Sequence, residues 1–256
     1  MKNRLIFIII TAFLSFSNAV SAQIDTTFWF AAPWVTPSHA NNVPVVFRLS
    51  SFENPTTVRL YQPAGTFDTT VVVPPNSLNS VFVSHIINTL EAKPANTALD
   101  YGIKIEADTL ITVVYEVVTN VNNPETYSLK GSNGVGLEFV TPFQTSWNNG
   151  SYSPIAPKQM FCIVATEDNT TIWITPRAAI IGHPAGITYS ITLDKGQVYT
   201  AENVTQATSV SGNNLSGSII VADKPIAVTI SDDSVTNSGG GCRDLMGDQI
   251  VPVEVV

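Results

Sequence analysis

The sequence predicts an all-β protein made of two tandem antiparallel β-sandwich units, and three observations support this prediction. Val and Thr, which favour strands, are abundant throughout the chain. Apolar segments of about 5 to 7 residues are separated by Pro, Gly, Asn and Asp, a spacing typical of β-sandwiches. The chain also repeats itself after roughly 110 residues, whereas the blades of the rival architecture, a β-propeller, run to about 40 to 50 residues. We therefore favour sandwiches.

The internal repeat is clearest in residues 102–115 and 217–230. Identical residues stand in register there: Gly102, Ile105, Ala107, Asp108, Ile111 and Val113 match Gly217, Ile220, Ala222, Asp223, Ile226 and Val228. Upstream, Phe47, Glu53, Thr56 and Thr57 match Phe161, Glu167, Thr170 and Thr171, and Phe30 and Pro33 match Phe139 and Pro142. The offset drifts from 109 through 114 to 115, as expected when the loops of a duplicated unit accept insertions. We place the two units at residues 23–133 and 134–256.

Residues 1–22 are typical of a secretory signal peptide. Lys2 and Arg4 precede an apolar run, and small residues at Val20 and Ala22 suit signal peptidase. The apolar run has roughly half of the 20 residues that a membrane span needs. We expect cleavage before Gln23 and an exported chain.

The strands follow from local patterns taken in order. FWFAAPW at residues 28–34 opens the first unit, and GLEFVTP at residues 136–142 opens the second. Residues 43–62 and 67–83 alternate apolar and polar residues around turns that contain Pro, which predicts two hairpins, and residues 187–199 repeat the second of them. Residues 83–90 predict a short helix.

The repeated segments 102–115 and 217–230 each predict a strand, a tight turn and a second strand. Asp108 and Asp223 stand where an aspartate side chain can bond the amides of a turn, so we interpret them as turn residues rather than catalytic ones. Residues 144–157, and the glycine-rich residues 238–248, predict loops.

Charge and composition exclude several classes of protein. Without the two cations of the signal, residues 23–256 carry 10 basic and 20 acidic residues, which argues against a nucleic-acid partner or an anionic membrane surface. The chain is 44% hydrophobic and only 12% charged, so it folds around a core instead of forming an acidic tail. No later segment is apolar enough to insert into a membrane.

The two cysteines leave two alternatives open. In an exported chain, Cys162 and Cys242 suggest a disulfide that would clip the glycine-rich loop to the second unit. Cys162 stands in the apolar run FCIV, however, where a buried free thiol is equally natural.

The titratable residues predict no catalytic residue, no metal and no cofactor. Four acidic residues lie near the C-terminus: Asp232, Asp233, Asp244 and Asp248. They predict either a solvated acidic loop or a Ca²⁺ site, although no fixed ligand spacing is present. The three histidines, His39, His85 and His183, have no partners at metal-ligand spacing. No nucleophile elbow or phosphate loop is present.

Three segments resemble the IgGFc-binding protein N-terminal domain family. They are FWFAAP at residues 28–33, IVADKPIAV at residues 220–228 and GCRDLMGDQIVPV at residues 241–253. The resemblance is to the bacterial branch, which is found in large secreted or cell-surface proteins, and it covers nearly all of the mature chain. The family often has a second Cys shortly before the first, where this chain has Asp232 and Asp233. By the repeat rule a further strand should begin after Val256, so we expect a C-terminally truncated sequence.

The resemblance implies a non-catalytic, secreted or cell-surface module for adhesion or binding. Its partner would be an extracellular protein or glycoprotein, such as immunoglobulin Fc or a mucin-like polymer. Trp34, Trp147 and Tyr152 are the candidate aromatic residues of a binding surface. The alternatives are a structural spacer in a large surface protein and a glycan-active domain.

Overall fold

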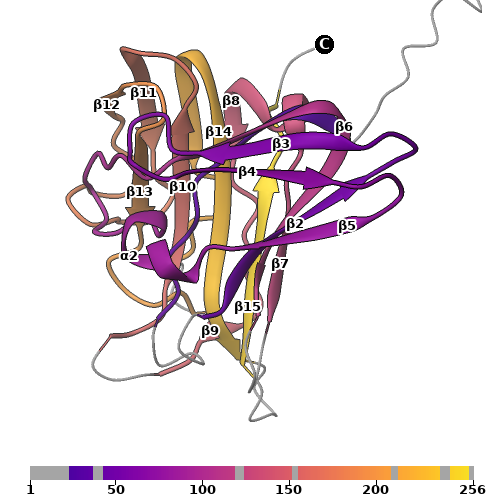
Figure 1. Ribbon diagram of the computed structural model, residues 1–256. Coiled ribbons are helices and arrows are strands. Elements are labelled where there is room, and N and C mark those ends of the chain that lie inside the picture. The colour runs from indigo at the N-terminus through magenta and orange to yellow at the C-terminus, as the bar shows by residue number, and fades with distance from the viewer. Residues whose placement is uncertain are drawn as a thin grey trace, which may run out of the picture.

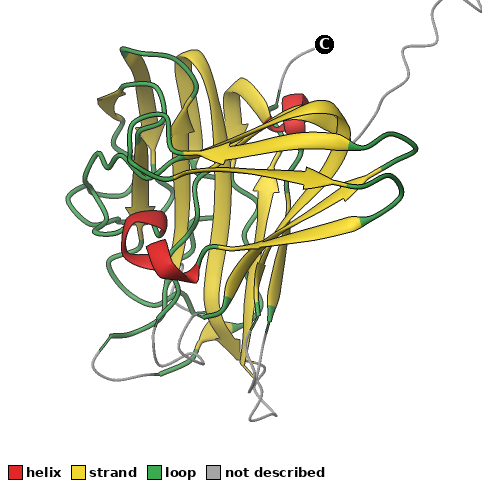
Figure 2. Ribbon diagram, viewed as in Figure 1, coloured by secondary structure: helices red, strands yellow, loops and turns green. Residues whose placement is uncertain are grey.

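The structure is a computed structural model that describes residues 23–36, 43–118, 124–151, 155–208, 213–236 and 243–253. It is all-β, as predicted, with two antiparallel sheets that each curl around their own core (Figures 1 and 2). Short helices cover residues 84–90, as η2 (Ser84–Ile86) and α2 (Ile87–Leu90), and η3 (Gly131–Gly134) joins the two sheets. The predicted signal peptide lies outside the described residues. Within them, the structure has no helix with the length and hydropathy of a membrane span.

The first sheet has seven strands in the order β4-β3-β6-β2-β5, and β1 and β7 also pair with β6. The strands are β1 (Asp25–Phe30), β2 (Val45–Ser51), β3 (Thr56–Tyr61), β4 (Asp68–Val73), β5 (Leu78–Phe82), β6 (Ile103–Val117) and β7 (Glu125–Ser128).

The second sheet repeats this order as β12-β11-β14-β10-β13, with β8, β9 and β15 also pairing with β14. Its strands are β8 (Val135–Val140), β9 (Asn148–Asn149), β10 (Gln159–Ala165), β11 (Thr170–Thr175), β12 (Tyr189–Leu193), β13 (Val198–Glu202), β14 (Ile219–Thr236) and β15 (Arg243–Ile250). Sheets of seven and eight strands are not the four-stranded blades of a propeller. In Figure 1, β2 to β5 run across the view, whereas β10, β13 and β14 run up it.

The predicted hairpins at residues 102–115 and 217–230 are wrong, because each segment lies within one long, bent strand. In β6, Ala107 pairs with Val58 of β3, and Ile111 then pairs with Ser51 of β2. The strand therefore changes its partner at the bend and belongs to both layers of the sandwich. The bend is a β-bulge, which bends a strand without ending it. A bulge can hold a proline, because no backbone hydrogen bond between strands is lost there. Asp108 lies in this bend.

Asp223, at the same bend in β14, makes a different hydrogen bond from the one predicted. Asp223 accepts a hydrogen bond from Thr171 N of the neighbouring strand β11 (2.8 Å) rather than from the amides of a turn. A carboxylate here satisfies an N–H group across the gap in the ladder.

Strand pairing corrects further predictions. The predicted hairpin at residues 43–62 is wrong, because β2 and β3 flank β6 on opposite sides, and the same holds for β10 and β11 around β14. The hairpins predicted at residues 67–83 and 187–199 are also wrong, because β4 and β5, like β12 and β13, lie at opposite ends of the strand order. Phe28 pairs with Ile105 and Phe139 pairs with Ile220, and these two isoleucines are counterparts. The counterpart of Phe139 is therefore Phe28 rather than Phe30.

The core of each sandwich is formed by side chains that alternate with outward-facing ones along its strands. In β3, Val58 and Leu60 point inward between exposed neighbours, the pattern of a half-buried strand. The first core is rich in aromatic residues, with the Phe30 and Tyr115 rings 4.9 Å apart. It also contains Leu245 from β15, a strand of the second sheet. The two units therefore share part of a core.

The equivalent strands β2 and β10 differ in burial. Strand β10 is buried along its whole length, whereas Arg48 and Ser50 of β2 are half-buried between buried residues. The difference arises because the outer face of β10 packs against the first unit. This apolar interface consists of Trp29, Ala31, Trp34 and Ala92 on one side and Met160, Cys162, Val164, Val198 and Ala227 on the other.

Candidate binding site

The segment that follows β1 is hydrogen-bonded to the second unit. Trp34 Nε1 donates to Glu202 Oε2 (2.8 Å), and Lys158 Nζ donates to Glu202 Oε1 (2.9 Å). Thr36 N and Oγ1 both donate to Asp233 Oδ2, at 3.0 and 2.8 Å. Trp34 is only 7% exposed, so its prediction as a surface aromatic is wrong. Its ring fills the apolar interface, and a buried carboxylate accepts from its N–H group.

The two adjacent aspartates of β14 are buried instead of lying in a solvated loop. Asp232 accepts hydrogen bonds from Gln144 Nε2 (2.8 Å), Gln159 Nε2 (2.9 Å) and Asn149 Nδ2 (2.6 Å), and burial raises its pKa. Burial also raises the pKa of Asp233 to about 6. Because amide N–H donors surround the Asp232 carboxylate, it is not arranged to ligate Ca²⁺. These residues hold buried loops to β14.

The other acidic residues and the histidines are dispersed. Asp244 and Asp248 lie on strand β15, so the loop predicted for residues 238–248 is wrong from Arg243 onward. Asp248 forms an ion pair with Lys130 (3.0 Å). His183 stacks on Tyr189 with the ring centroids 3.4 Å apart, and His39 lies outside the described residues. Across the part of the chain that the structure describes, no group of three or more His, Cys, Asp or Glu side chains could hold a metal ion.

Cys162 is buried at the interface between the units. Its Sγ lies 3.2 Å from Thr200 Oγ1, and burial raises the pKa of the thiol to about 12. Cys242 lies outside the described residues, so the predicted disulfide stays a prediction.

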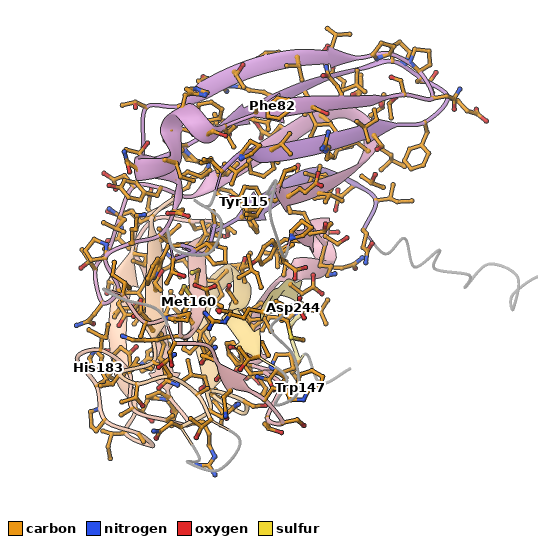
Figure 3. The ribbon with its side chains drawn as sticks, turned by 90° about the horizontal axis from the view of Figure 1, so that it is seen from below. Phe82, Tyr115, Trp147, Met160, His183 and Asp244 are labelled. Carbon is orange, nitrogen blue, oxygen red and sulfur yellow. The ribbon has the colours of Figure 1, made fainter. Side chains whose placement is uncertain are left out.

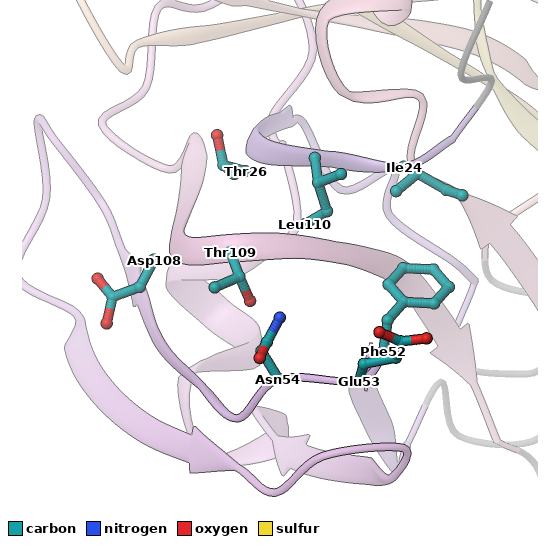
Figure 4. A pocket seen from close by; sticks show the side chains of 8 residues that line it. All are labelled: Ile24, Thr26, Phe52, Glu53, Asn54, Asp108, Thr109 and Leu110. Atoms are coloured by element: carbon teal, nitrogen blue, oxygen red, sulfur yellow. The ribbon is translucent and has the colours of Figure 1, made fainter. Parts of the chain in front are cut away.

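An open pocket of about 670 Å³ lies at the bend of β6, beside β1 and the turn between β2 and β3 (Figure 4). Phe52 and Leu110 are exposed apolar side chains in its wall. Asp108 and Glu53 bring two carboxylates to it from different elements (Figure 4). The full lining is Ile24, Thr26, Phe52, Glu53, Asn54, Asp108, Thr109 and Leu110.

A second pocket, of about 570 Å³, lies at the corresponding bend of β14. Its wall includes residues 135–137 of β8, at the places that residues 24–26 hold in the first pocket, and Asp223 and Pro225, the counterparts of Asp108 and Leu110. The remaining wall differs. It consists of Asp25, Thr27 and Trp29 of β1, together with Ser132, so here the first unit forms part of the wall.

The two pockets have the same chemical character. Each combines apolar side chains with two carboxylates, and neither lining includes Lys or Arg. In the second pocket, burial by itself raises the pKa of Asp25, but hydrogen bonds from Ser132, Thr26 and Thr27 outweigh burial and the pKa is lowered. Such a pocket suits an apolar side chain that ends in a cation, because the stem buries its carbons while the carboxylates attract the charge.

The other two predicted surface aromatics have different outcomes. Trp147 is 43% exposed and lies in the second unit, at the opposite end of the molecule from Phe82 of the first unit (Figure 3), and it lines neither pocket. Tyr152 lies outside the described residues. Sequence reasoning missed both pockets, although Asp108 and Asp223 were recognised as a repeated pair. The signal that pointed to them was the identical polar break inside two apolar segments, which marks a bulge as well as a turn.

Comparison with known proteins gives one positive finding. The family described as IgGFc binding protein matches residues 125–256, from β7 to the C-terminus. No curated protein matches the chain, and no solved structure matches it.

Proposed function

Because the chain belongs to the IgGFc binding protein family, we propose that it is a non-catalytic binding module that acts outside the cell. Its partner is an extracellular protein or glycoprotein, with immunoglobulin Fc and mucin-like polymers as the first to test. A signal-like N-terminus and a net-acidic mature chain support this role.

The open pocket at the bend of β6 is the observation that carries the proposal. It combines exposed apolar side chains with carboxylates, and part of the wall of its counterpart in the second unit comes from the neighbouring unit of the same protein. We therefore infer that the site receives a protein segment. A Lys or Arg side chain of the partner would place its stem against Leu110 and its charge near one of the two carboxylates, Asp108 or Glu53, which lie on opposite sides of the pocket (Figure 4).

The test is retention of the full chain on immobilised immunoglobulin Fc, mucin and a panel of polysaccharides. We expect a protein or glycoprotein member to retain the chain and Leu110→Lys to weaken retention at least about tenfold, because it removes an apolar wall residue and places a cation where the partner's cation should bind. Ile187→Lys is the matched control, since Ile187 is an exposed apolar residue that lines neither pocket. Equal losses in both variants would remove the pocket as the site.

One observation favours a second function, a structural spacer. The units share Leu245 and an apolar interface, so they form a stiff pair of the kind a surface protein uses to hold another domain at a distance. Failure of every panel member to retain the chain at micromolar concentration would support this function instead.

A further inference from the structure

The contact between the two units is directional, because each unit contributes a different face. The first unit presents Trp29 and its neighbours from β1, and the second presents the outer face of β10 and β13. We call the β1 side of a unit its donor face and the side with the β2-type and β5-type strands its acceptor face. Because the units are repeats, each unit has both a donor face and an acceptor face. The interface uses one face of each unit and leaves the other face of each unit unused.

The unused acceptor face belongs to the first unit. Strand register makes Leu78 the counterpart of Val198 and Phe82 the counterpart of Glu202. In the second unit both positions are buried against the first unit. In the first unit, Leu78 is 58% and Phe82 is 56% exposed. They are large apolar side chains at positions that the repeat uses for contact.

The polar groups at the centre of this face already have partners. Arg48 Nε donates to Glu116 Oε2 (2.7 Å), and Arg48 Nη1 donates to Ser80 Oγ (2.8 Å). The counterpart of Arg48 is the buried Cys162. Covering the face would therefore leave no unpaired charge, although burying the ion pair limits the affinity.

The unused donor face belongs to the second unit, where it is apolar. Val140 is the counterpart of the interface residue Trp29. Beside it, Ile219 and Trp173 are the counterparts of Lys104 and Arg59, which border the interface without belonging to its apolar core. In the first unit, Lys104 and Arg59 form ion pairs with Glu106 and Asp68. In the second unit, 41% to 50% of each apolar side chain is exposed on this side: Val140, Ile219, Trp173 and Val253.

These four side chains lie close together. Val140 pairs directly with Ile219, and Trp173 pairs with Val221, two residues along β14. Val253 N donates to Glu138 O (2.7 Å), which places that residue beside β8. A contiguous exposed apolar face of this kind marks an interaction surface.

We propose that the chain associates head to tail with a second copy of itself, the donor face of one copy packing on the acceptor face of the next. The contact repeats the one already made between the two units. It is heterologous, so each added copy leaves one donor and one acceptor face open, and the assembly grows with concentration. The packed β10 interface shows how an acceptor face looks when it is occupied.

Sedimentation of the full chain from micromolar to millimolar concentration tests the proposal. We expect the average mass to rise continuously with concentration. Val140→Lys with Val253→Lys inactivates the donor face, because it places two cations on exposed apolar positions of that face, and Leu78→Lys with Phe82→Lys inactivates the acceptor face. Each double variant alone should be a monomer, while a one-to-one mixture should form a dimer and stop there, because one working face of each kind remains.

Val72→Lys is the matched control, since Val72 is an exposed apolar residue of β4 outside both faces, and it should associate like the wild type. Circular dichroism checks that each variant is folded, and the corresponding single variants replace a double variant that is not. A wild-type chain that stays monomeric throughout the range overturns the proposal. So does a mixture that fails to dimerise, or a control that loses association equally.

Discussion

The burial of carboxylates is the feature of single residues that the sequence predicts least well. Asp232 and Asp233 follow one another, which in a sequence indicates a solvated loop, yet β14 carries both into the interior. Their hydrogen-bond donors come from residues distant in the chain, among them Gln144 and Thr36. Partners that only the tertiary fold supplies cannot be predicted from local composition. Trp34 was misjudged for the same reason, because its acceptor Glu202 lies in the other unit.

Glu125 is the carboxylate whose titration should have the clearest effect on stability. Its pKa is raised to about 7, mainly by burial and also by the charges of Asp248 and Asp244, while hydrogen bonds from the backbone of Thr126 and Gly247 act in the opposite direction. The folded-state pKa lies above the ordinary value of 4.5, so the native state holds this proton more tightly than the unfolded chain. The stability that the proton contributes is fully present below a pH of about 4.5 and is lost as the pH rises through about 7.

Glu125→Gln should therefore raise the free energy of unfolding at a pH of about 8 by about 1 kcal/mol, a figure reduced for solvent screening at this half-buried site. Near a pH of about 5 the variant and the wild type should be almost equally stable. Urea unfolding across this range measures the difference. Glu167→Gln, at an exposed turn, is the control and should show no such trend; a constant gap between Glu125→Gln and the wild type would contradict the assignment.

At the scale of elements, the sequence predicts strands well and their partners poorly. Alternating residues located most strands of both units, and the repeat predicted that the two sheets would resemble each other. Alternation around a polar break does not distinguish a hairpin from a bent strand, which is why residues 102–115 and 217–230 were misread. The pairing of β2 with β6 depends on contacts between residues 60 to 72 positions apart, which no local pattern records. Neither pocket could be predicted, because both arise at these bends.

Strand β15 packs so closely on β7 that one added methyl group should lower the stability of the fold. A Cβ atom at Gly247 would lie 2.6 Å from Tyr127 Cζ, and the Tyr127 ring is fully buried. Gly247→Ala should therefore lower the free energy of unfolding by about 1 to 3 kcal/mol, the usual cost of overpacking. Chemical denaturation measures the loss. Met246→Ala, at the adjacent and partly exposed position, should cost clearly less, and equal costs would mean that the contact with Tyr127 is not responsible.

At the scale of the whole molecule, the two units should unfold together. Leu245 of β15 lies in the core of the first unit, and Gln249 Nε2 donates to Trp29 O (2.6 Å) across the interface. Loss of either unit therefore exposes apolar surface of the other.

Leu245→Ala should lower the stability of both units by the same amount, about 2 to 4 kcal/mol. Hydrogen exchange of the most protected amides in β2 and in β10 measures the two units separately. We expect both sets to lose equal protection, and Leu110→Ala, at an exposed residue of the first unit, to leave both unchanged. Loss of protection confined to β2 would show that the units unfold independently.

The position of Leu245 also has a consequence for biosynthesis. A ribosome makes β1 to β7 long before it reaches residue 245, so the nascent first unit lacks one of the side chains that fill its interior. The core of the first unit can therefore be completed only after β15 has been synthesised. This order suits the export proposed above, because a translocation channel threads unfolded chains.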